Sequence, residues 1–118
     1  MDYTVEFWQY LDTLASCSRL EVDRPKGSTH PRFPGQAYPL DYGYLEGTNS
    51  PDGSGIDLWI GSQGPGQITG ILCTVDLFKR DGELKLLFGC TEEDVQCILE
   101  YVNCQSMRAI YIPRHAGG

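Results

Sequence analysis

The sequence predicts a mainly β fold of the α+β class, in which short strands form a small, partly closed barrel with a helix near each end. Apolar residues recur at helical spacing over residues 4–16 and again over 91–103. Between them lie five or six short apolar or alternating runs separated by glycine turns. At 118 residues, the chain is long enough for one domain, 1–118, with its own core.

The N-terminal segment is predicted to be an amphipathic helix. Val5, Trp8, Leu11 and Ala15 form an apolar stripe at helical spacing over residues 4–16. We expect this stripe to pack on the rest of the domain. The alternative is a contact between copies of the chain, so a homo-oligomer is a candidate assembly.

The most unusual stretch, residues 38–61, combines three tyrosines with a glycine-rich turn. Asp52 lies in the turn, and Asp57 lies in the apolar strand predicted at Ile56–Ile60. Carboxylates beside a glycine turn are ligands that hard cations prefer. The alternative is a solvated Asp-Gly turn that closes a strand.

A hairpin is predicted downstream, where Asp81-Gly82 separates two extended runs, Ile68–Lys79 and Glu83–Gly89. A two-residue loop at Asp81-Gly82 would place Asp76 opposite Leu87. Alternation then divides the hairpin into an apolar face and a mixed face. The mixed face comprises Asp76, Phe78, Arg80, Glu83, Lys85 and Leu87.

The C-terminal part is predicted to form a helix and a last strand. Thr91 is the expected N-cap, and three acidic residues follow it in the first turn, where the helix dipole favours negative charge. The alternation over Met107–Ile112 predicts a strand that ends at Pro113.

Composition excludes several classes of function. The formal charge of −7 argues against a nucleic-acid surface, and no apolar run is long enough to span a membrane. The first residues do not form a signal peptide, and five cysteines without a C-x-x-C pair indicate reduced thiols, so we expect a cytoplasmic protein. Phosphate-loop and dinucleotide-binding motifs are absent from the sequence.

Four carboxylates remain as candidate ligands for a metal. Converging carboxylates repel one another unless cations hold them, and Mg²⁺ binds carboxylates while it keeps waters to share with phosphate. The sequence alone leaves two interpretations open, a metal–phosphate site and scattered surface acids. The four residues are Asp52, Asp57, Asp76 and Glu83.

Several segments together resemble the soluble inorganic pyrophosphatase family. They are YPLDYGYLEG, DGSGID and GILCTVD followed by ELKLL, in the order, spacing and residue type of that family, and the match runs from about Leu20 to Leu87. The resemblance implies a five-stranded, OB-like closed barrel flanked by an N-terminal and a C-terminal helix. It also implies hydrolysis of pyrophosphate to phosphate with Mg²⁺, or another divalent cation, as cofactor.

The resemblance assigns roles residue by residue. It makes Asp52, Asp57, Asp76 and Glu83 metal ligands, with Asp23 near the position of an early metal-site glutamate. Asp57 and Lys85 are the residues implied to be catalytic. The residues implied to bind phosphate are Arg32, Tyr42 and Lys85.

Departures from the family pattern define an alternative function. The aspartate that is the family's candidate general base is Ser54 here, and a serine hydroxyl does not accept a proton at neutral pH without a base of its own. The asparagine of the YP-x-NY segment is Asp41, and the segment after Arg32 is short. The alternative is a degenerate domain that binds a metal, a phosphorylated small molecule or a protein partner without turnover.

Overall fold

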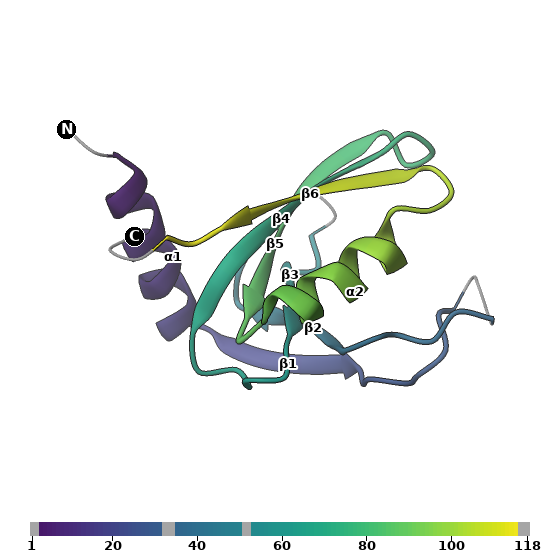
Figure 1. The fold of residues 1–118 in the computed structure, drawn as a ribbon. Helices are drawn as coiled ribbons and strands as arrows, with labels where there is room; N and C mark the ends of the chain where they lie inside the picture. Colours follow the sequence, from purple (N-terminus) through teal and green to yellow (C-terminus); the bar gives the residue numbers. More distant parts are fainter. Residues whose placement is uncertain (1–2, 32–34, 51–52, 116–118) are drawn as a thin grey trace.

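One mixed sheet organises the computed structural model, which describes residues 3–31, 35–50 and 53–115 (Figure 1). Its strand order is β1-β2-β3-β5-β4-β6, and the neighbouring strands are antiparallel except for the parallel pair β3–β5. The elements are α1 (Tyr3–Ser16), β1 (Arg19–Arg24), β2 (Asp41–Glu46), β3 (Ile56–Ile60), β4 (Ile68–Asp76), β5 (Asp81–Phe88), α2 (Glu92–Val102) and β6 (Met107–Pro113).

The predicted five-stranded closed barrel is wrong. The sheet has six strands and stays open, because β1 and β6 lie at opposite ends of the strand order (Figure 1). The side chain of Asn103 provides hydrogen-bond partners for some of the backbone groups on the outer edge of β6. Its Oδ1 accepts from the Ala109 N–H at 2.9 Å, and its Nδ2 donates to the Ala109 carbonyl at 3.4 Å. Alternating sequence patterns predict strands, but they do not show whether the first and last strands of a sheet pair to close a barrel.

The β4–β5 hairpin forms, but its register differs from the predicted one. Asp76 pairs with Asp81 rather than with Leu87, a shift of six residues, so the loop is Leu77–Arg80. Asp76 Oδ1 accepts hydrogen bonds from the backbone of Phe78 at 2.9 Å and of Lys79 at 3.2 Å, which fixes this turn. Because the shift is an even number, the paired residues keep their predicted faces.

The two helices pack on opposite faces of the sheet. Trp8 and Leu11 of α1 are buried in one apolar cluster with Ile71 of β4. Ile98 of α2 is buried in another cluster with Leu72, which is the next residue of β4 and therefore points to the other face. The expected packing of the N-terminal stripe on the domain is thus observed.

The predicted N-cap of the second helix is confirmed. Thr91 and Asp94 form a capping box, in which each side chain accepts from the other residue's backbone N–H. Asp94 Oδ2 also accepts from the backbone N–H and the hydroxyl of Ser62, at 2.9 and 2.8 Å. The cap therefore ties α2 to the loop after β3.

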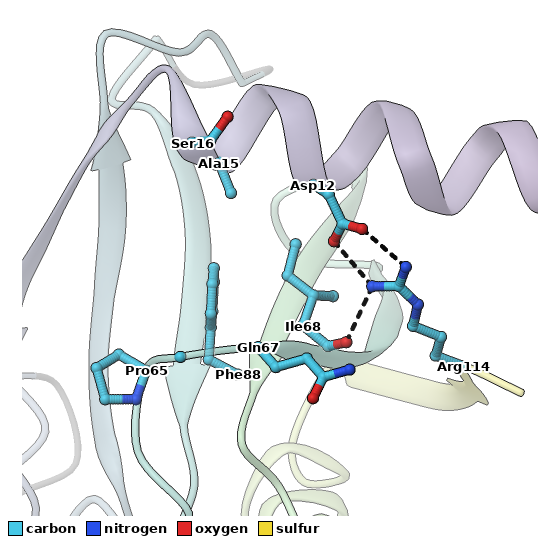
Figure 2. A pocket seen from close by; sticks show the side chains of 9 residues that line it. Asp12, Ala15, Ser16, Pro65, Gln67, Ile68, Phe88 and Arg114 are labelled. Carbon is cyan, nitrogen blue, oxygen red and sulfur yellow. Dashed lines mark hydrogen bonds and ion pairs between the residues drawn. The ribbon is translucent and has the colours of Figure 1, made fainter. Parts of the chain in front are cut away.

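An ion pair connects α1 to the end of β6. Arg114 donates from both terminal guanidinium nitrogens, Nη1 and Nη2, to the Asp12 carboxylate at 2.8 Å each, and Nη1 also donates to the carbonyl of Ile68 (Figure 2). The guanidinium also lies over the ring of Trp8, 5.6 Å from its centroid. These contacts border a cavity of about 430 Å³, and its remaining lining includes Ala15 and Phe88.

Within the described residues, neither helix is long and apolar enough to cross a membrane. All five cysteines are free thiols.

Candidate functional site

Lys85 is the centre of a cluster of polar side chains on the α2 face of the sheet. Its Nζ donates to Tyr42 Oη at 2.8 Å and to Asp57 Oδ2 at 3.1 Å, and it lies 3.8 Å from Glu83 Oε2. The Lys85 side chain is 7% exposed, so its charge is almost completely removed from solvent. A buried ammonium needs such partners, because an unpaired charge is costly to bury.

The strand register brings these side chains together. Asp57 and Lys85 directly precede Leu58 and Leu86, which pair across the parallel strands β3 and β5. Tyr42 pairs with Trp59 across β2 and β3. Since alternate residues of a strand share a face, residues from three strands meet at one place on the sheet.

A cavity of about 660 Å³ opens beside this cluster. Its charged lining residues are Asp57, Glu83 and Lys85, together with Asp76 and Lys79 from the hairpin. Its other walls come from β3, from α2 and the segment after it, from the start of β6 and from the loop before β2. The residues there include His30, Tyr38, Trp59, Tyr101, Val102 and Met107.

Burial and the neighbouring acids together keep the Tyr42 hydroxyl protonated. Burial, then the charge of Asp57 and a hydrogen bond to that carboxylate, raise the pKa of Tyr42 well above its usual value. The phenol therefore remains a neutral donor and acceptor at every physiological pH. It can hold an anionic oxygen without adding negative charge of its own.

Asp76 lines the cavity, but one of its oxygens already has a structural role. Oδ1 accepts from Ser106 Oγ at 2.7 Å in addition to the two backbone donors of the hairpin loop. The hydrogen bond from Ser106 is the main cause that lowers the pKa of Asp76, so this carboxyl is ionised. Asp76 thus contributes negative charge to the cavity with little freedom to move.

Other predicted site residues lie elsewhere. Asp23 is exposed on β1 and does not line the cavity, and Ser54 is exposed in the turn before β3. Asp41 Oδ1 accepts from the backbone N–H of Lys26 at 2.8 Å, which is a structural role. Arg32 and Asp52 lie outside the described residues.

The fit to a metal ion is incomplete in the part of the chain that the structure describes. Within that part, no three His, Cys, Asp or Glu residues are grouped so as to hold a metal. Asp57 and Glu83 both face the Lys85 ammonium, which partly neutralises them. The predicted ligand set also needs Asp52, so magnesium stays a prediction.

Sequence reasoning missed the aromatic part of the cavity. His30, Tyr38, Trp59 and Tyr101 come from three separate segments, the loop before β2, β3 and α2, and their rings line the same cavity as Lys85. The tyrosines of residues 38–44 were visible as a cluster in the sequence, but nothing local indicated that Tyr101 would join them.

Comparisons with known proteins support the fold. No protein-family model and no curated protein matches the sequence. Among solved structures, the chain is similar to an inorganic pyrophosphatase from Coxiella burnetii, with a TM-score of 0.53 and 14% identity, covering 85% of this chain and 84% of that one. The fold is pyrophosphatase-like. At this level of identity, the likeness extends to the fold alone.

Proposed function

We propose that this chain is a metal-dependent hydrolase of a phosphoanhydride, with pyrophosphate as the reference substrate and Mg²⁺ as the reference cofactor. The observation that carries the proposal is the convergence of Asp57, Lys85 and Tyr42 beside one cavity. These three residues come from segments that resemble the pyrophosphatase family, and the pyrophosphatase-like fold supports the same function.

The charge of the cavity supports a metal together with the phosphate. Three described carboxylates, Asp57, Asp76 and Glu83, face two ammonium groups, those of Lys79 and Lys85. A polyanion alone would enter a wall that is already net negative, which is unfavourable. A divalent cation bound by the carboxylates reverses this balance of charge, so that binding of the phosphate chain becomes favourable.

The residues then have separate roles. Asp57, Glu83 and Asp76, with Asp52, would hold the cation, which when bound lowers the pKa of a coordinated water. Lys85 and Tyr42 would turn from Asp57 to the phosphate oxygens and stabilise the charge that develops as the bridging P–O bond breaks. Arg32 remains a proposed additional phosphate contact.

The test is release of phosphate from pyrophosphate in the presence of Mg²⁺. We expect activity that chelator abolishes and that Asp57→Asn reduces by at least about 100-fold, since Asp57 both binds the cation and pairs with Lys85. Glu93→Gln is the matched control, because it removes an exposed carboxylate from α2, away from the cavity. No release with any of several divalent cations would contradict the hydrolase.

A second candidate is a binding domain without turnover. It is favoured by the Lys85 ammonium, which already partly neutralises Asp57 and Glu83, and by the exposed Ser54 at the position of the family's base. This candidate predicts that Mg²⁺ with pyrophosphate raises the melting temperature while no phosphate is released. A melting temperature that neither ligand changes would contradict both candidates.

A further inference from the structure

The lining of the cavity beside Lys85 contains two chemically different groups of side chains in mutual contact. We call the group of Lys85, Asp57 and Glu83 the charged end. We call the group formed by the rings of His30, Tyr38, Trp59 and Tyr101 the ring-lined end. Pyrophosphate is polar throughout, so it would use the charged end and leave the ring-lined end filled by water. A volume of about 660 Å³ lies within the roughly 300–1,000 Å³ typical of sites for organic ligands.

We propose that the natural ligand is an organic phosphoanhydride, in which the phosphate chain is joined to a planar aromatic group such as a nucleobase. The proposal rests on the proposed function for its phosphate end. The planar group would lie against the exposed side of the ring-lined end, where stacking and apolar contact replace water.

The rings already have geometry suited to stacking. His30 and Tyr38 lie nearly parallel, with centroids 5.8 Å apart and an interplanar angle of 12°. Tyr38 and Tyr101 are 5.3 Å apart at 39°, which leaves their faces oblique to one another. A flat ligand placed against Tyr101 would extend this series of rings.

Trp59 also lines the cavity, but its polar group is covered by protein. Its side chain is buried, with 1% of the residue exposed, and its Nε1–H has no hydrogen-bond partner among the described residues. A buried donor without a partner is unusual in proteins. Because protein atoms cover that nitrogen, a ligand in the cavity would contact the indole ring of Trp59 and not its Nε1–H.

The test compares two ligands that share the anhydride and differ in the planar group. Binding of ADP and of pyrophosphate, each with Mg²⁺, is measured by titration calorimetry at a temperature where turnover is slow. We expect ADP to bind about tenfold tighter, since one stacked base contributes about that factor. The indole N–H signals in the NMR spectrum give a second readout, and we expect the Trp59 signal to shift more with ADP.

Variants separate the ring-lined end from the charged end. Tyr101→Leu should weaken the binding of ADP about tenfold and leave the binding of pyrophosphate unchanged. Tyr111→Leu should change the affinity for neither ligand. Tyr111 is the matched control, because it is also a half-buried tyrosine packed on the same core but does not line the cavity. If Tyr101→Leu does not fold, His30→Ala on the loop gives the same comparison.

Two results would overturn the proposal, and they are distinguishable. Equal affinity for both ligands, with pyrophosphate still bound or hydrolysed, would refute the aromatic ligand and leave the proposed function intact. Failure of both ligands to bind would refute the phosphate site itself and this proposal with it.

Discussion

Lys85 and Asp57 form a cross-strand ion pair between the only two parallel strands of the described sheet, with 3.1 Å between Nζ and Oδ2. The two residues come from segments nearly thirty residues apart, yet each directly precedes one of two buried leucines, Leu58 and Leu86, that pair across the strands. The apolar core therefore fixes the position of the charge pair.

Lys85→Met should destabilise the fold and increase its affinity for cations. Loss of the ammonium leaves Asp57 and Glu83 facing each other. We expect a decrease of about 2 kcal/mol in the free energy of unfolding, less than the roughly 3–5 kcal/mol for a fully buried pair, because Asp57 retains contact with solvent. Mg²⁺ should then raise the melting temperature of the variant more than that of the wild type.

Lys79→Met is the control for that experiment, since Lys79 lines the same cavity but is exposed. It should change the free energy of unfolding by less than about 0.5 kcal/mol. A similar loss in both variants would show that the position of the charge does not matter.

Ser54→Asp tests whether only a proton acceptor is missing. If the proposed hydrolase lacks its base, restoring a carboxylate should raise the rate of phosphate release by about 10²–10⁴. The same assay on Ser50→Asp, at another serine of the same loop, controls for added negative charge. An unchanged rate in Ser54→Asp would favour the binding domain without turnover.

Gly43→Ala should destabilise the protein because of a close approach of backbone. A Cβ at Gly43 would collide with the carbonyl of Glu21 in β1, and neither backbone segment can give way without breaking the β1–β2 pairing. We expect a loss of more than about 2 kcal/mol in a urea titration. Gly66→Ala, which meets no atom within 4 Å, should have little effect.

Asp94 should contribute stability that depends on pH. Burial is the largest single influence and raises its pKa, but the hydrogen bonds from Thr91 and Ser62 together outweigh burial, so the pKa of Asp94 lies below its usual value. A lowered pKa in the folded state gives stability that is complete above the unfolded value near 3.9 and is lost as the pH falls through the folded value.

Asp94→Asn tests this dependence by urea unfolding at pH 7 and at pH 3. The variant should be less stable than the wild type by about 1–3 kcal/mol at pH 7, and the difference should shrink at pH 3. Glu93→Gln, at the neighbouring exposed acid, should show little difference at either pH. A difference that is the same at both pH values would contradict the role of the ionised cap.

Local signals predicted the elements, and distant contacts decided the rest. The Thr91 cap and the apolar stripe of α1 depend on neighbours in sequence, so they could be predicted. The hairpin loop moved because Asp76 holds the turn through the backbone of Phe78 and Lys79 and is itself held by Ser106, which lies 30 residues later. The barrel prediction failed for a similar reason, because strand alternation says nothing about whether β1 and β6 meet.

In the candidate site too, features set by local sequence could be predicted and features set by distant contacts could not. The alternation of side chains along the hairpin correctly placed Glu83 and Lys85 on one face. The resemblance to the pyrophosphatase family indicated Tyr42 and Asp57 as residues of the same site. The ring-lined end was not predicted, because Tyr101 comes from α2, and its approach to the cavity depends on how that helix packs on the sheet.

The amide of Asn103 has a consequence for the behaviour of concentrated solutions. A strand with free backbone donors and acceptors can recruit any extended chain, and growth of that kind leads to fibres. With its own amide, Asn103 occupies the N–H and the carbonyl of Ala109, in the middle of β6. A single side chain thereby removes one pairing position of that strand from an incoming chain.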